Sequence, residues 1–192
     1  MKVRKVLKVG ILSIAAFFLT FSGSASATTF TGGKTTAIKN AYYTDSVYSL
    51  GYQTIFDEGK ANWNALSSKV QINWVSSSSG LPDKYYVGTT STAGLLGYAP
   101  PYKYAADGVN FILADTSDKW AYSTVSAYDN QIKALRLTRT EIVSSVTTHE
   151  IGHTLSLAHS PSGVSSVMTK SAITNFAPTT YDKNDLVSKW GK

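Results

Sequence analysis

All three histidines of the chain fall within one eleven-residue window, residues 149–159, which reads His-Glu-Ile-Gly-His-Thr-Leu-Ser-Leu-Ala-His. His149 and His153 are four residues apart, so on a helix their side chains share one face, about 6 Å apart along the axis. Both imidazoles can then reach one metal ion. For His159 to supply a third nitrogen, the helix must end before it and the chain must turn back. The window therefore requires a helix, a tight turn at its C-terminus, and a following loop that brings His159 back towards the helix.

Glu150 follows the first histidine and points to the neighbouring side of the helix, where its carboxylate can hydrogen-bond a metal-bound water without binding the metal. Three neutral imidazoles leave a zinc ion its full charge, which lowers the pKa of bound water from about 15.7 to roughly 7. Glu150 would accept that water's proton and deliver it to the leaving amine. A lone helical histidine is more often structural, but three histidines at this spacing beside a glutamate predict a hydrolytic zinc site.

The window resembles the zinc motif of the metzincin metallopeptidases, H-E-x-x-H-x-x-G-x-x-H followed by a methionine turn. The three ligands and the glutamate match. A serine, Ser160, follows the third histidine, and this resembles the matrixin branch (the matrix metalloproteinase catalytic-domain type). The chain would be a bacterial-style secreted form of that type. Met168 lies nine residues past His159, where a methionine turn would place a hydrophobic floor under the zinc site. Taken alone, Met168 would be ordinary core filler.

Weaker similarities cover most of residues 28–192. Trp63 and Val70–Trp74 are similar to the first helix and next strand of matrixins, and Asp182–Gly191 is similar to their closing helix. Gly94–Pro100 resembles the edge strand that pairs with substrate backbone, so the predicted substrate-binding residues are Leu95, Leu96, Gly97 and Tyr98. The resemblance implies an α+β fold, a metzincin-like single domain with a twisted mixed β-sheet, an active-site helix, a first long helix and a C-terminal helix.

Three positions depart from the family pattern. Ser156 replaces the usual glycine, which leaves the helix in a left-handed conformation, and a serine there costs about 1 kcal/mol. Lys170 stands where some metzincins place a zinc-contacting tyrosine, so we expect no tyrosine ligand. Matrixins often hold a second, structural zinc with further histidines, and Leu113 stands near one such position. We therefore expect one catalytic zinc only.

Calcium is a second candidate cofactor. Asp115 and Asp118, shortly before Trp120, resemble positions where matrixins place calcium-binding carboxylates, and Asp107 and Asp129 are further candidates. Exposed loop aspartates are usually solvated or cap turns. The sequence leaves calcium binding open.

Hydrophobic periodicity also indicates an α+β class. Apolar residues at helical spacing predict a long first helix, and alternation of Val70, Ile72 and Trp74 with polar residues predicts a half-buried strand. Asp182 is the predicted N-cap of the last helix. The expected elements are helices over residues 46–67, 140–155 and 182–189, and strands over residues 70–74, 85–89, 95–98 and 109–113.

Residues 1–27 have the pattern of a secretory signal peptide. Residues 9–21 are almost wholly apolar but too short to span a bilayer comfortably, and Ala25 and Ala27 fit a signal-peptidase site. The positive start consists of Lys2, Arg4, Lys5 and Lys8. We therefore expect a secreted, extracellular protein that begins at Thr28, with an uncleaved N-terminal anchor as the alternative.

Charge and composition exclude some partners. The chain has 18 basic and 12 acidic residues, and the predicted signal holds four of the bases, so residues 28–192 carry a net charge of +2. This charge predicts no nucleic-acid partner. With no cysteine, the domain has neither disulfides nor a lipid-modified cysteine anchor. Residues 28–192 suffice for one domain. We expect a monomer with no membrane partner.

The leading functional hypothesis is a secreted zinc-dependent endopeptidase whose extended polypeptide substrate lies against Leu95–Ala99. Residues 169–178, called the wall segment below, would form the outer wall of the pocket beyond the cleaved bond, and Ile173 and Phe176 favour an apolar side chain there. Two alternatives stay open: a cell-envelope peptide hydrolase, and a non-catalytic zinc- or peptide-binding module on the same fold. Glu150 argues against the module, because metal ligation alone does not require it.

Overall fold

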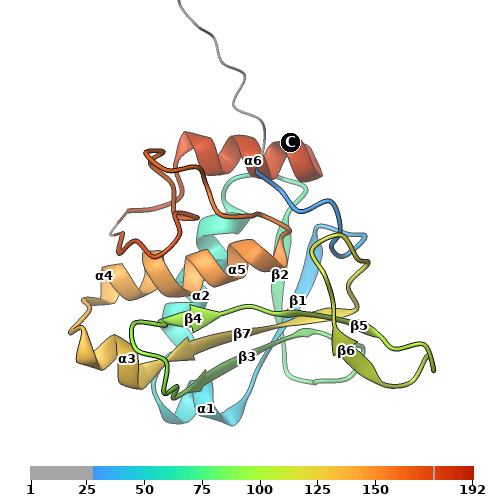
Figure 1. Ribbon diagram of the computed structural model, residues 1–192, viewed down its shortest axis with the longest axis horizontal. Helices are drawn as coiled ribbons and strands as arrows, with labels where there is room; N and C mark the ends of the chain where they lie inside the picture. Colours follow the sequence, from blue (N-terminus) through green and yellow to red (C-terminus); the bar gives the residue numbers. More distant parts are fainter. Residues whose placement is uncertain (1–27, 175) are drawn as a thin grey trace, which may run out of the picture.

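The computed structural model describes residues 28–174 and 176–192, and the predicted signal peptide lies outside the described residues. Strands come mainly first and helices last, as the α+β prediction requires (Figure 1). In chain order the elements are β1 (Ile38–Tyr43), α1 (Asp45–Ser49), α2 (Gln53–Asn64), β2 (Gln71–Val75), β3 (Asp83–Gly88), β4 (Gly97–Tyr98), β5 (Pro101–Tyr104), β6 (Phe111–Leu113), β7 (Tyr122–Tyr128), α3 (Asp129–Ala134), α4 (Arg139–Ile142), the π-helix η1 (Val143–Thr148), α5 (His149–Thr154) and α6 (Thr180–Trp190).

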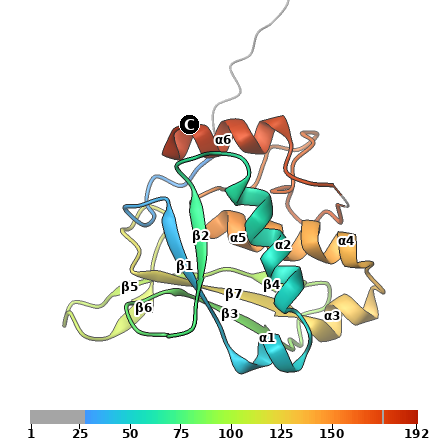
Figure 2. The same ribbon diagram turned by 180° about the vertical axis from the view of Figure 1, so that it is seen from behind.

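The strands form one twisted mixed sheet in the order β2-β1-β3-β7-β5-β6, with β4 also paired to β7. The β1–β2, β1–β3 and β3–β7 pairs are parallel, and the pairs that involve β4, β5 and β6 are antiparallel. β1 and β2 can be parallel because the chain crosses between them through α1 and α2 (Figure 2). The mixed sheet with several helices confirms the predicted fold class.

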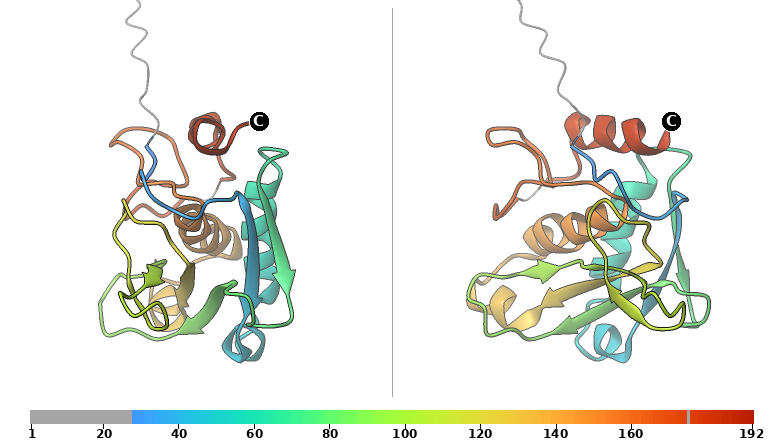
Figure 3. Two further views of the ribbon diagram at one scale, coloured as in Figure 1. Left: turned by 90° about the vertical axis from the view of Figure 1, so that its right-hand side faces the viewer. Right: turned by 45° about the vertical axis from the view of Figure 1, so that its right-hand side comes forward.

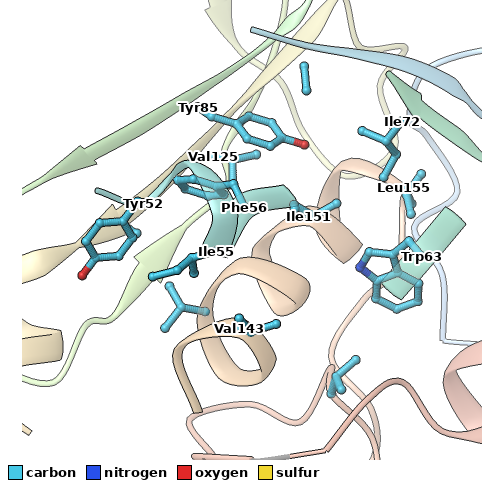
Figure 4. Packing of buried hydrophobic residues seen from close by; sticks show 14 of the residues in the cluster. Tyr52, Ile55, Phe56, Trp63, Ile72, Tyr85, Val125, Val143, Ile151 and Leu155 are labelled. Carbon is cyan, nitrogen blue, oxygen red and sulfur yellow. The ribbon is translucent and has the colours of Figure 1, made fainter. Parts of the chain in front are cut away.

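Buried and partly exposed residues alternate along β3 and β7, and the buried ones mark the face of the sheet that packs against the helices. Tyr85 and Val125 are fully buried on the inner face, whereas their outward neighbours remain partly exposed. Phe56 of α2 and Ile151 of α5 pack against this inner face, as the close-up in Figure 4 shows. Burying each such side chain stabilises the fold by about 1.5–3 kcal/mol. The core therefore lies between the sheet and α2 with α5.

The predicted first helix over residues 46–67 is two helices. The chain breaks between α1 and α2 at Gly51, whose φ of +75° is left-handed and favours glycine. The backbone N–H of Tyr52 then donates to Val47 O over 2.9 Å, and α2 begins at the next residue. Trp63, near the end of α2, donates from Nε1 to Thr148 O over 2.8 Å and so fixes α2 to η1.

The predicted second helix is confirmed, because α4, η1 and α5 run without interruption from residue 139 to residue 154. A capping box between Thr138 and Glu141 begins it. Its middle, η1, is a wider π-helix in which every side chain is buried. Single π-helical turns of this kind occur often at functional sites. In Figures 1 and 3 the α5 end of this helix lies between the sheet and α6.

The prediction of Asp182 as the N-cap of the last helix is wrong. α6 begins at Thr180 with Thr179 as its N-cap, and Asp182 lies one turn further in. The buried Asp182 carboxylate accepts from Thr179 N at 2.7 Å, from Val167 N at 3.2 Å and from Ser166 Oγ. Asp182 therefore joins α6 to the segment that precedes Met168.

The four predicted strands correspond to β2, β3, β4 and β6: the ends of β2 and β3 differ from the prediction by one or two residues, and β4 and β6 begin two residues later and end as predicted. Four observed elements were not predicted from the sequence, namely β1, β5, β7 and α3. β4 ends at Tyr98, two residues before Pro100, and Pro101 begins β5, the strand position that proline tolerates best. No helix among residues 28–174 and 176–192 has the length and apolarity needed to cross a membrane.

Candidate metal centre

Three histidines converge beside α5. His149 and His153 lie one helical turn apart on α5, and His159 comes from the loop that follows. Their ring centroids are 4.9 to 5.2 Å apart, and one nitrogen of each ring lies within 4.8 Å of the others. Within the described chain this is the only group of three or more histidine, cysteine or carboxylate side chains placed closely enough to hold one metal ion.

Backbone carbonyls fix which nitrogen of two of the rings is free for a metal. His149 Nδ1 lies 2.8 Å from Val167 O, and His153 Nδ1 lies 2.8 Å from Leu157 O. A carbonyl oxygen only accepts, so each Nδ1 carries the proton and each Nε2 is left with its lone pair. Such outer contacts orient histidine ligands in metal sites. The arrangement fits an ion bound through Nε2.

Burial keeps these rings neutral. It lowers the pKa of His149 to about 4 and the pKa of His153 to about 3, and it also lowers the pKa of His159, with a smaller contribution from Lys170. At neutral pH the imidazoles are therefore deprotonated, which is the state that metal ligation requires.

The exit from α5 depends on Ser156. This residue has φ of +64°, a left-handed conformation that favours glycine, and its buried hydroxyl has no hydrogen-bond partner in the described chain. The turn lets Leu157 N donate to Gly152 O over 3.2 Å and sends the chain back towards His159. The predicted left-handed exit is confirmed, together with its strain.

Residues 28–30 support this exit loop, which the sequence did not reveal. Phe30 N donates to Ser156 O over 2.8 Å, and Ala158 N donates to Thr28 O over 2.9 Å, so the two segments run antiparallel. The Phe30 ring is stacked on the His153 ring with centroids 6.0 Å apart and an interplanar angle of 23°. Phe30 thus packs directly on one of the three histidines.

Glu150 lies beside the histidines under β4. A Cβ atom on Gly97 would be 2.6 Å from Glu150 Cγ and 2.8 Å from Oε1, so the side chain has room only because residue 97 is glycine. Burial raises the pKa of Glu150 to about 8. A cation on the histidines would lower this pKa again, since an opposite charge nearby favours the carboxylate. A glycine inside a predicted strand was the available signal of this close approach.

Met168 lies beneath α5, as the methionine-turn prediction requires. It is buried, and a Cβ atom on Gly152 would be 2.4 Å from its Sδ. Ser160 N donates to Met168 O over 3.0 Å, which holds the turn against the residue that follows His159. Val167, the neighbour of Met168, supplies the carbonyl that orients His149. Asp182 of α6 accepts from Val167 N, so Val167 connects α6 to His149.

A cleft of about 560 Å³ contains the three histidines and Glu150. Leu95, Leu96, Gly97 and Tyr98 line it on the β4 side, and residues 169–173 of the wall segment line the other side. The structure thus places the predicted metal ligands, the predicted base and the predicted substrate-binding residues around one cavity. Cavities of this size with few polar groups are typical of ligand sites.

Three of the four calcium candidates, Asp107, Asp118 and Asp129, have protein partners for their carboxylates. Asp118 accepts from Lys103 Nζ at 2.6 Å and from Asp115 N at 2.7 Å, and the lysine contact lowers its pKa. Asp107 accepts two backbone N–H groups of its own turn, and Asp129 pairs with a lysine one turn along α3. None of these carboxylates belongs to a cluster of three potential ligands within the described residues. Leu113 is exposed on β6 and offers no ligand atom.

Comparisons with known proteins add little to this geometry. No protein-family model matches the sequence, and no match is found among curated proteins. Among solved structures, 39 chains match, including one described as "Structure of myroilysin". That structure aligns with a TM-score of 0.45 and 12% sequence identity, over 88% of this chain and 98% of that chain. So distant a similarity carries no argument about the chemistry of the site.

Proposed function

We propose that this chain is a zinc-dependent endopeptidase. The observation that carries the proposal is the convergence of three neutral histidines with a buried glutamate in one cleft. His149, His153 and His159 would hold one Zn²⁺, because three imidazoles with one open position form a common catalytic zinc set. When bound, zinc supplies a Lewis acid for a carbonyl oxygen and lowers the pKa of water to about 7.

Glu150 would move the protons of the reaction. Its carboxylate takes a proton from the attacking water and then gives that proton to the nitrogen of the departing amine, so it ends the cycle ionised. Its place beneath β4 supports this role, because a peptide lying along β4 would pass directly over the carboxylate. A base that is screened from bulk water and adjacent to the scissile bond is typically worth about 10²–10⁴-fold in rate.

The substrate would be an extended polypeptide. β4 borders the cleft and pairs with β7 in an antiparallel register, Gly97 with Ala127 and Tyr98 with Ser126. We propose that a peptide aligns with β4 by strand addition, through main-chain hydrogen bonds that do not depend on sequence. Leu96, Leu135 and Ile173 make the cleft apolar beyond the histidines, which favours an apolar side chain after the cleaved bond. We also propose that the protein acts outside the cell as a monomer.

Cleavage assays with matched metal states test the proposal. Purified protein should degrade unfolded casein, lose this activity after chelation and regain it with one equivalent of zinc. His153→Ala should remove most of the bound zinc and the activity together. Purified cell wall serves as the second substrate, and release of wall peptides without casein cleavage would favour the envelope hydrolase. Zinc-loaded protein that cleaves neither substrate would overturn the proposal in favour of a binding module.

A further inference from the structure

Two adjacent serines of the π-helix η1 hold the wall segment. Thr174 N donates to Ser145 Oγ over 2.6 Å, and Ser145 Oγ donates to Thr174 O over 2.9 Å. Ser144 Oγ lies 2.5 Å from Thr174 Oγ1 and donates to Phe176 O over 2.7 Å. Ser144, Ser145 and Thr174 are all buried. We call this group of three residues the hydroxyl clasp.

The clasp is the main attachment of the wall segment. Within the described chain, the hydrogen bonds that tie residues 170–178 to other elements all go to Ser144 or Ser145. Thr169, at the start of the segment, is fixed separately through Ser160 and Ser166. Residues between these two attachments line the cleft. Their position therefore depends on the clasp at one end and on the methionine turn at the other.

The π-helical turn explains how two neighbouring serines serve one segment. In an α-helix, successive side chains point about 100° apart around the axis. The wider π turn reduces that angle, and the hydroxyls of Ser144 and Ser145 both reach residues 174–176. Ser145 also lines the cleft beside His149. The residues that hold the wall segment are thus rigidly connected to the helix that carries the histidines.

We propose that the hydroxyl clasp sets the width of the side-chain pocket between η1 and the wall segment, and that Ser145 is a specificity-determining positioning residue. This inference rests on the proposed peptidase function. Replacing Ser145 by alanine leaves a buried N–H and a buried C=O of Thr174 without partners, which favours displacement of the wall segment towards water. A displaced wall no longer contacts a large apolar side chain, whereas a small side chain loses nothing.

The kinetic test compares two peptides that differ only in the residue after the cleaved bond, leucine or alanine. Ser145→Ala should lower the leucine-to-alanine ratio of kcat/KM by about tenfold, mainly through a higher KM for the leucine peptide. Zinc content should stay at one per chain. An unchanged ratio, or an equal loss on both peptides, would overturn the proposal.

A matched control and a second measurement separate this inference from the function on which it rests. Ser123→Ala also removes a buried serine hydroxyl, but that hydroxyl has no partner in the described chain and lies on β7 outside the cleft. Amide hydrogen exchange over residues 169–178 should become about tenfold faster in Ser145→Ala and stay unchanged in Ser123→Ala. If the parent cleaves neither peptide, the peptidase proposal fails, and the exchange measurement alone tests whether the hydroxyl clasp holds the wall segment. An unchanged amide exchange rate over residues 169–178 in Ser145→Ala would overturn the proposed role of the clasp.

Discussion

Replacing Ser156 by glycine should stabilise the protein, because two unfavourable features meet at this residue. Its φ of +64° places a Cβ atom in the left-handed region, which costs about 1 kcal/mol. Its hydroxyl is completely buried without a partner in the described chain, which costs about 1–3 kcal/mol. Glycine removes both costs.

Two opposing effects reduce the gain. Glycine adds conformational freedom to the unfolded chain, which costs about 0.5–1 kcal/mol. The lost side chain also packs against Gly33, and a buried group of this size contributes about 0.8 kcal/mol. The net expectation is an increase of about 1 kcal/mol in the free energy of unfolding, or a rise in Tm of about 2–4 °C for a chain of this length.

Urea unfolding of zinc-free protein measures the effect without a contribution from metal binding. Ser156→Ala is the control, because it removes the hydroxyl and keeps the Cβ atom in the left-handed region. Both variants lose the hydroxyl cost, and they should differ by less than about 1 kcal/mol, because the strain of about 1 kcal/mol that glycine relieves is opposed by the cost of about 0.5–1 kcal/mol from its conformational freedom in the unfolded chain. A glycine variant that is less stable than both the parent and the alanine variant would refute the reasoning about this turn.

Three further substitutions test other parts of the structure. Gly152→Ala would place a Cβ atom 2.4 Å from Met168 Sδ, so it should lower the free energy of unfolding by about 1–3 kcal/mol, although alanine normally favours helices; a higher Tm would contradict this packing. Phe30→Ala removes the ring stacked on His153 and should speed zinc loss to a chelator several-fold, while Phe30→Leu should not. Burial lowers the pKa of Lys39 to about 7 from 10.5. The unfolded chain then binds more protons between these values, so stability should rise with pH across this window. Lys39→Met should abolish that rise in urea titrations at pH 7 and 10, and an unchanged pH dependence would contradict the assignment.

The convergence of the three histidines was predictable from sequence because the residues that produce it are close together in the chain. His149, His153 and His159 lie within eleven residues, and helix geometry alone places two of them on one face. The left-handed exit at Ser156 was predicted from the position at which the metzincin motif has glycine. The contacts that orient the site are not local. Asp182 reaches Val167 across fifteen residues, and its position near a helix start made it look like a simple cap.

The missed strands have physical reasons as well. In β1 the inward position between two exposed residues is Lys39, so the expected alternation of apolar and polar residues is broken. In β7 the outward residues include Tyr122 and Tyr128, and Ser123 is among the inward residues, so the expected alternation holds only over residues 124–127, too short a stretch to indicate a strand. The π-helical turn of η1 depends on hydrogen bonds between residues five apart, for which composition gives no signal.

The paired measurement of zinc content and cleavage rate for Glu150→Gln tests the central claim most directly. Glutamine has nearly the shape of glutamate and fits under Gly97, but it cannot accept a proton at neutral pH. The variant should fold, keep one zinc per chain, and cleave unfolded protein about 10²–10⁴-fold more slowly than the parent. A variant that keeps its zinc and cleaves as fast as the parent would contradict the assignment of Glu150 as the base and the mechanism built on it.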